Sequence, residues 1–215
     1  MSDIDSDLQK EQLSTLESFF WSVACDCLVQ TFNKGEYRKI ILPMLVIRRF
    51  DAVLEPTKAK VLAENEKLKS RGEKHPQNFL KKASKQTFYN TSKFSLKDLR
   101  ARTSPQQLKS DFTDYLNGFS ENVQEIIQYF GFAKEIDKLV NSGRLHLLIE
   151  KFTSPQINLA PFPVPNSDGS VRLPALDNHS MGTLFEKLLR RFNEENNVTE
   201  AGEHFTPRDI VALMA

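Results

Sequence analysis

The sequence has little glycine and cysteine and no long apolar run. Eight Gly in 215 residues are too few for an all-β fold built on tight turns. No stretch approaches the roughly eighteen apolar residues of a transmembrane helix, and the acidic N-terminus MSDIDSDLQKEQ is unlike a signal peptide. Cys25 and Cys27 lack zinc or redox-pair spacing, so we expect both to be small packing residues. These absences predict a cytoplasmic protein with no disulfide and no membrane span.

Motifs of self-contained enzymes are also missing. The sequence contains no Gly-rich phosphate loop, no G-x-G pattern at a strand–helix junction, no H-E-x-x-H and no G-x-S-x-G. Its four histidines, His75, His146, His179 and His204, are scattered and do not pair with acids at helical spacing. We therefore expect no complete active site and no metal site in this chain.

Charge is distributed unevenly along the chain. The formal net charge is +1, and the hydrophobic and charged fractions of 40% and 27% are typical of a globular protein. Residues 57–109, however, carry fourteen Lys or Arg against four Asp or Glu, whereas residues 1–30 carry one Lys against six acids. This basic block, residues 57–109, is consistent with a polyanion contact and equally with a solvated helical face.

Apolar spacing predicts helices over most of the chain, so the expected fold class is mainly α. The first helix should cover roughly residues 13–32, with a capping box at Ser14–Glu17 and Gly35 in the left-handed conformation after its end. Residues 36–55 are the most apolar stretch and favour a helix over a strand, with Pro43 expected to kink or break it. Arg48 and Arg49 should pair with acids at the surface, and Trp21, Phe19, Phe20, Tyr115 and Phe119 should be core anchors.

Further helices are expected after Pro56, from Ser104-Pro105, from Ser120, over 134–141 and over 145–152. Residues 71–78 should be a loop, and residues 79–103 are weakly patterned. Residues 153–174 hold five of the ten prolines, which predicts extended chain along the surface through Phe162 and Val164, with a turn at Ser167–Ser170 that could close a small hairpin.

These patterns suggest a division of the chain into four parts. A flexible N-terminus covers 1–12, a helical N-terminal domain 13–153, a Pro-rich connector 154–176, and a helical hinge 177–215. The chain stops at Ala215 while the apolar pattern of a last helix still continues, so we expect a piece of a longer protein whose chemistry lies downstream.

The last helix has a well-formed start. Thr206 is suited to the N-cap, Pro207 to the first position, and Asp209 can return a capping bond. On these residues alone the segment is either only a helix start or an anion site at a helix N-terminus behind Gly202.

Three segments together are similar to a known family. Residues 202–214, GEHFTPRDIVALM, resemble the G-E/Q-F/Y-F/Y-T-P-R-x-I/V-V-x-L-M segment of the methylation subunit of type I restriction–modification systems. Residues 181–194, MGTLFEKLLRRFNE, resemble that family's G-x-x-Y/F-E-x-L-L-R-x-F helix, and residues 19–55 resemble its opening pattern around a tryptophan and an L-P pair. The middle of the chain, 71–153, adds little. Two positions depart from the pattern: His204 stands where many members have an aromatic residue, and Phe185 where Tyr is common.

The resemblance implies an adenine-specific DNA methyltransferase that uses S-adenosylmethionine in the full-length protein. By position, Phe205, Thr206 and Pro207 would line the methionine end of the cofactor, with Glu203 and Arg208 nearby. The family's cofactor loop and N-P-P-F/Y tetrapeptide are absent, so the catalytic residues and the Rossmann-like methyltransferase domain are expected beyond Ala215. The fragment alone should bind no cofactor and have no activity.

The resemblance also implies partners: a specificity subunit, a second methylation subunit, a restriction subunit and double-stranded DNA, with no membrane. This piece would serve subunit assembly and DNA clamping, with Lys81, Lys82, Lys85 and Lys93 of the basic block as candidate phosphate contacts. The alternative is a free-standing helical DNA-binding or adaptor protein whose working surface is the basic block 57–109.

Overall fold

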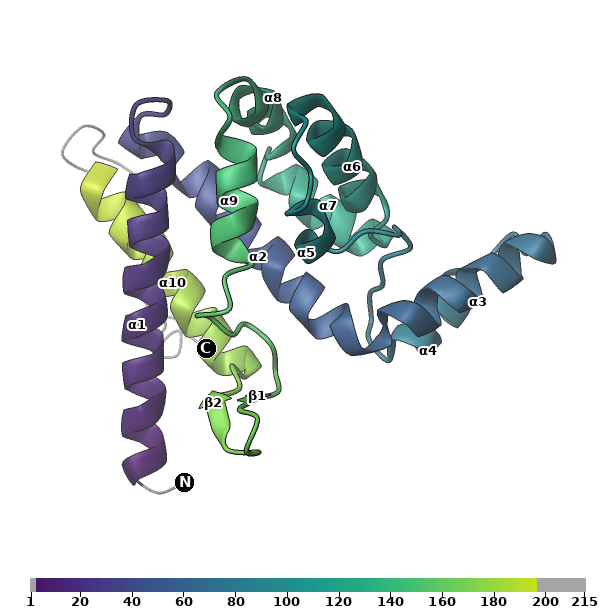
Figure 1. The fold of residues 1–215 in the computed structure, drawn as a ribbon, viewed down its shortest axis with the longest axis horizontal. Helices are drawn as coiled ribbons and strands as arrows, with labels where there is room; N and C mark the ends of the chain where they lie inside the picture. The colour runs from purple at the N-terminus through teal and green to yellow at the C-terminus, as the bar shows by residue number, and fades with distance from the viewer. Residues whose placement is uncertain (1–2, 197–215) are drawn as a thin grey trace, which may run out of the picture.

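The structure, a computed structural model, describes residues 3–196, and side-chain positions within 10–195. This part of the chain is mainly helical, as the sequence predicted, with ten α-helices and one two-stranded hairpin (Figure 1). The helices are α1 (Asp3–Leu28), α2 (Arg38–Leu54), α3 (Lys58–Ser70), α4 (Gln77–Ser84), α5 (Leu96–Leu99), α6 (Pro105–Asn117), α7 (Glu121–Tyr129), α8 (Ala133–Asn141), α9 (Arg144–Phe152) and α10 (Asn178–Asn196). The strands are β1 (Val164–Pro165) and β2 (Val171–Leu173), and short 3₁₀ turns η1 (Lys34–Glu36) and η2 (Glu55–Thr57) flank α2.

Helix α2 runs through the core and packs against α9 and α10, and α1 packs on those two helices. Its side chains Ile40, Ile41, Met44, Leu45 and Ile47 are fully or almost fully buried, which matches a helix that is apolar on most of its circumference. Pro43 was expected to kink or break this helix, and the helix continues through it without a break. Packing on several sides compensates for the hydrogen bond that proline cannot donate.

The first helix differs from its prediction at both ends. It begins at Asp3 rather than near residue 13 and ends at Leu28. The predicted capping box at Ser14–Glu17 is wrong, because these residues lie inside the helix, where the Thr15 hydroxyl donates to the Glu11 carbonyl. The Gly35 prediction is also wrong: Gln30, with φ 77°, takes the left-handed conformation instead, and Gly35 lies in η1.

A contact far away in sequence accompanies the longer α1. The Gln12 side-chain amide donates to the Pro174 carbonyl at 3.3 Å, which joins the helix to the segment before α10. Helix α10 itself packs along α1, and its buried side chains Leu184, Leu188 and Phe192 belong to the same core. Long-range contacts of this kind are not visible in a local capping pattern.

The Pro-rich segment between α9 and α10 is attached to the core by Arg49. This guanidinium is buried rather than at the surface, and it donates to the carbonyls of Leu159 and Leu176 and to Asn178 Oδ1. The expectation that Arg49 pairs with a surface acid is therefore wrong. Arg48 does pair with an acid, Asp51, but both side chains are buried.

The same segment is held by apolar residues different from those expected. Ile157, Leu159, Ala160 and Leu176 are buried, whereas Phe162 is 37% exposed. The predicted turn at Ser167–Ser170 does close the β1–β2 hairpin, with Gly169 at φ 85°. Within residues 3–196, no helix combines the length and the hydrophobicity that a membrane span requires.

Helices α3 and α4 form an arm, residues 58–85, that extends from the rest of the molecule (Figure 1). The two helices pack on each other through a small cluster of their own: Val61, Leu68 and Leu80, with Tyr89 from the following segment. This cluster is separate from the main core. The arm thus presents much of its surface to solvent, which explains the charged composition of α3.

Candidate functional site

The arm concentrates positive charge on a projecting element. Two of its lysines are neutralised by neighbours on α3, since Lys67 and Lys69 form i,i+3 ion pairs with Glu64 and Glu66. Besides Lys58, which is described below, six arm cations form no ion pair with any described residue: Lys60, Arg71, Lys74, Lys81, Lys82 and Lys85. An element with this excess of unpaired cations has an electrostatic field suited to a polyanion.

The four lysines predicted to contact DNA divide into two groups. Lys81 and Lys82 lie in the last turn of α4, and Lys85 is its C-cap residue in the left-handed conformation, with φ 55°. Lys82 and Lys85 are exposed and Lys81 is half-buried. Lys93 is separate, because it lies beyond the arm at the edge of a cavity and its ammonium is 4.9 Å from the Phe94 ring centroid.

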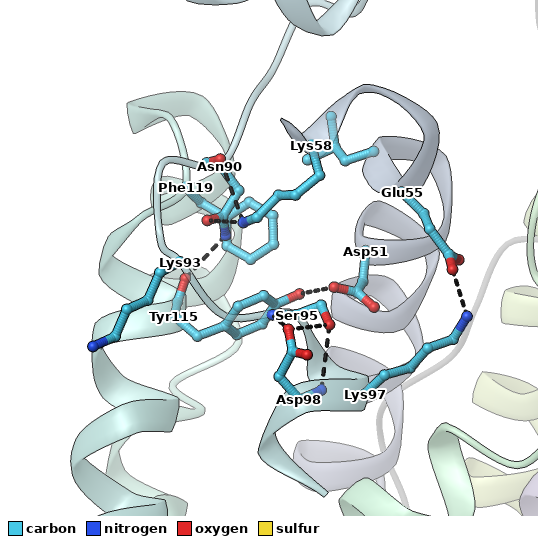
Figure 2. Close-up of a pocket in the computed structure, with 11 residues that line it drawn as sticks. Asp51, Glu55, Lys58, Asn90, Lys93, Ser95, Lys97, Asp98, Tyr115 and Phe119 are labelled. Carbon is cyan, nitrogen blue, oxygen red and sulfur yellow. Dashed lines mark hydrogen bonds and ion pairs between the residues drawn. The ribbon is translucent and has the colours of Figure 1, made fainter. Parts of the chain in front are cut away.

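That cavity lies where the arm joins the body, and we call it the elbow cavity (Figure 2). Its volume is about 170 Å³. It is lined by side chains from the end of α2, η2, the start of α3, the segment 90–98, helix α6 and the residues after α6: Asp51, Leu54, Glu55, Lys58, Asn90, Lys93, Ser95, Lys97, Asp98, Tyr115 and Phe119. The walls are therefore partly apolar, with titratable groups facing one another across the space.

Asp51 is a buried carboxylate on one wall of the elbow cavity. Its Oδ1 accepts from the Tyr115 hydroxyl at 3.0 Å and from the Leu96 backbone N–H at 3.2 Å, while its Oδ2 lies 3.4 Å from the Arg48 guanidinium. Burial raises the pKa of Asp51, and the nearby Arg48 charge and these hydrogen bonds oppose the rise. Burial, followed by the charge of Asp51, also raises the pKa of Tyr115 well above its ordinary value.

Lys58 faces Asp51 from the first turn of α3. Its ammonium donates to Asn90 Oδ1 at 3.0 Å and reaches the Asn90 carbonyl at 3.5 Å, but it forms no ion pair with a described residue. Amide oxygens satisfy N–H donors without neutralising the charge, so burial is the largest effect on this group and lowers the pKa of Lys58 to about 8. The charges of Asp51 and Asp98 act in the opposite direction.

Asn90 is held in place by the backbone around it. Its amide donates to the Tyr115 carbonyl at 3.0 Å, and its Oδ1 accepts from the Ser92 N–H at 2.8 Å. Gly118 permits this approach: a Cβ there would lie 2.7 Å from Asn90 Oδ1 and 2.6 Å from Ser92 N. The segment 89–92 thereby lies against the α6–α7 junction and positions the oxygen that Lys58 contacts.

One ion pair and one capping box lie at the rim of the elbow cavity. Lys97 pairs with Glu55, and Asp98 forms a capping box with Ser95 at the start of α5 (Figure 2). The Lys93 ammonium points away from the other labelled side chains (Figure 2). Lys58 therefore differs from the other two lysines that line the cavity. Its ammonium points into the cavity and has no carboxylate partner among the described residues.

The elbow cavity could not be predicted from the sequence. Its members come from segments far apart in the sequence, and residues 79–103 had no clear pattern. One local signal was available, because Asp51 follows Arg48 by three residues within the most apolar helix, which indicates an internal ion pair. The sequence carries no comparable signal for Lys58 or Asn90.

The residues proposed for the cofactor, Glu203, Phe205, Thr206, Pro207 and Arg208, lie outside the described residues. Their assignment stays a prediction. Within the part of the chain that is described, no group of three or more His, Cys, Asp or Glu side chains could hold a metal ion.

Comparison with known proteins identifies the family. A family model described as the HsdM N-terminal domain matches residues 16–152, more than half of the chain. The chain belongs to the HsdM N-terminal domain family. It is thus the N-terminal part of a methylation subunit of a type I restriction–modification system, as the sequence resemblance implied.

The HsdM N-terminal domain match runs from within α1 to the end of α9, and so contains the arm and the elbow cavity. The Pro-rich segment and α10 lie after it, although both pack on the same core. Searches of curated proteins and of solved structures found no match to the chain.

Proposed function

We propose that this domain holds double-stranded DNA within a type I restriction–modification assembly, with the arm as a phosphate-contacting element. The family membership supports a place in such a complex with other subunits and DNA. The observation that carries the proposal is the projecting arm, which besides Lys58 has six cations that form no ion pair with a described residue. Phosphate contacts of this kind depend on charge and not on base sequence.

The test uses the assembled methyltransferase, with the specificity subunit present. In one variant Lys81, Lys82 and Lys85 are changed to Ala. In a charge-matched control, three exposed lysines outside the arm are changed instead: Lys39, Lys109 and Lys134. DNA affinity is measured by fluorescence anisotropy at several salt concentrations.

Each lost phosphate contact should reduce the slope of log affinity against log salt by about 0.9. For three lost contacts, we therefore expect this slope to be smaller in magnitude by up to about 2.7 in the arm variant than in the wild type. The slope of the control variant should stay close to that of the wild type. Equal losses in both triple variants would show that only net charge matters, and the assigned role of the arm would then be wrong.

We further propose that the full-length protein transfers a methyl group from S-adenosylmethionine to adenine N6 in DNA in the cytoplasm. The segment 202–214 supports this through its likeness to the family's cofactor motif, with Glu203, Phe205, Thr206, Pro207 and Arg208 near the cofactor. A second methylation subunit and a restriction subunit would complete the assembly.

The 215-residue chain alone should be inactive. Residues 3–196 contain a two-stranded hairpin as their only sheet, and no parallel sheet of a methyltransferase domain. Incubation of the purified chain with labelled S-adenosylmethionine and DNA should transfer no label. Label in the DNA would contradict this expectation.

The same chain also tests the adaptor alternative. Tight DNA binding by the isolated chain, with a steep salt dependence, would favour a free-standing DNA-binding protein. Weak binding that becomes strong only with the specificity subunit would favour the assembly domain, which is the outcome we expect.

A further inference from the structure

The elbow cavity contains an amine in an unusual setting. Lys58 reaches across the cavity to the two oxygens of Asn90, and neither carries a charge (Figure 2). Most lysines that are paired in the described residues contact a carboxylate, as Lys97 does with Glu55 on the rim. A half-buried amine without a carboxylate partner loses its proton more easily than a solvated one.

The cavity also has room for a small group beside this amine. Its volume of about 170 Å³ is close to the roughly 150 Å³ void that accommodates benzene in a protein core. An acetyl group has fewer heavy atoms than benzene. Leu54 and Phe119 supply apolar wall for a methyl group, while Ser95 and Asn90 supply polar wall for a carbonyl.

We propose that Lys58 is a modification site at which a small activated acyl donor transfers its acyl group to Nζ inside the elbow cavity. The donor class is an acyl phosphate, for which acetyl phosphate is the probe. The lone pair of the neutral amine attacks the carbonyl carbon and a C–N bond forms. The bond between that carbon and the phosphate oxygen breaks, phosphate leaves with the bonding electrons, and the amine proton passes to water.

The electrostatic surroundings support this reactivity. The other titratable groups that line the cavity with Lys58 are Asp51, Glu55, Lys97, Asp98 and Tyr115, together with Lys93, whose ammonium points away. Glu55 is paired with Lys97 and Asp51 with Arg48. Burial outweighs the attraction of Asp51 and Asp98 for the ammonium, so the pKa of Lys58 falls to about 8. At pH 7.5 roughly a quarter of Lys58 is then neutral, against roughly 0.1% of an ordinary lysine of pKa about 10.4.

This difference sets the size of the expected effect. The neutral fractions alone favour Lys58 by roughly two-hundredfold. A less basic amine is also a weaker nucleophile, by analogy with thiols, whose nucleophilicity falls as their pKa falls. This reduces the rate advantage of Lys58 over an ordinary lysine to about tenfold. Lys60 is the matched control, because it lies two residues further along α3, is exposed, and forms no ion pair with a described residue.

The experiment measures acetylation of both lysines in the same molecule. The native chain is exposed briefly to acetyl phosphate between pH 7 and pH 11, and mass-spectrometric fragment ions of the peptide that contains both residues give the two rates. We expect Lys58 to react about tenfold faster than Lys60 at pH 7.5, with a rate that levels off above pH 8 while that of Lys60 continues to rise. Equal rates, or profiles of the same shape, would overturn the proposal.

Two further measurements show whether the reactivity of Lys58 comes from the folded cavity or from its neighbours in the sequence. In 8 M urea the preference for Lys58 should disappear, because the cavity no longer exists; a preference that persists would overturn the proposal. Asn90→Asp places a carboxylate on the ammonium and should reduce the acetylation rate of Lys58 about tenfold while Lys60 is unchanged. An unchanged acetylation rate of Lys58 in a folded Asn90→Asp protein would contradict the proposal. If that variant does not fold, the comparison of native protein with protein in 8 M urea is the deciding test.

Discussion

Replacement of Arg49 by Met should destabilise the protein and release the segment that leads to α10. Arg49 is 6% exposed, and its guanidinium donates to three acceptors: the carbonyls of Leu159 and Leu176, and Asn178 Oδ1. Methionine fills similar space but donates nothing. The change therefore leaves the two carbonyls and the amide oxygen without this donor.

The magnitude follows from these contacts. Each buried acceptor that loses its partner costs about 1–3 kcal/mol. Part of this is offset, because burial lowers the pKa of Arg49 and the variant no longer buries that charge. We expect a net loss of about 2–4 kcal/mol in the free energy of unfolding, or a fall in Tm of about 4–16 °C for a chain of this size.

Urea unfolding monitored by circular dichroism gives the free energy, and hydrogen exchange gives its location. The Leu176 amide, which donates to the Ala160 carbonyl at 2.9 Å, should exchange faster in Arg49→Met while amides of α6 do not change. Arg71→Met is the control, because Arg71 is exposed and has no ion pair with a described residue; it should change stability by less than about 0.5 kcal/mol. A loss below about 1 kcal/mol in Arg49→Met, or uniform exchange changes, would refute the reasoning.

Three other changes test the elbow cavity. The free energy of unfolding of the wild type, relative to that of Lys58→Met, should rise by about 1–3 kcal/mol from pH 7 to pH 10.5. Above pH 8 native Lys58 has lost the proton that the unfolded chain still binds, so a higher pH favours the folded state. Urea unfolding that gives the two proteins the same pH dependence would contradict this. Gly118→Ala should cost about 1–3 kcal/mol in the same assay, since its Cβ would lie 2.6 Å from Ser92 N, and an unchanged unfolding midpoint would count against that contact. Tyr115→Phe removes a donor to the buried Asp51 carboxylate and should cost about 1–3 kcal/mol at pH 7, whereas a neutral result would show that another donor replaces it.

Helix positions in the middle of the chain were predictable because their signals are local. Ser104 caps α6 through the Gln107 N–H, with Pro105 at the first helical position. Gly131 and Gly143 have φ of 66° and 68° at the ends of α7 and α8. In each case the side chain or the missing Cβ acts within four residues, so the sequence contains the whole cause.

The predictions that were wrong depend on distant residues. Ser14–Glu17 has the pattern of a helix start, but α1 continues through it and contacts Pro174 and α10. Arg49 looks like a surface cation in the sequence and is instead the buried donor that holds the chain before α10. A local pattern cannot reveal which carbonyls a distant segment will bring to a guanidinium.

The sequence by itself determined the mainly helical fold, the family, and the presence of a basic block, because periodicity, motif and charge are properties of the chain order. The tertiary structure decided how that charge is used: it places one part of the block on a projecting arm, and pairs another part, such as Lys97 with Glu55, at the arm's base. It also decided that Lys58 and Asn90, thirty-two positions apart, meet across one cavity. Solvent exposure and desolvation depend on which segments pack together, and only the folded chain determines that.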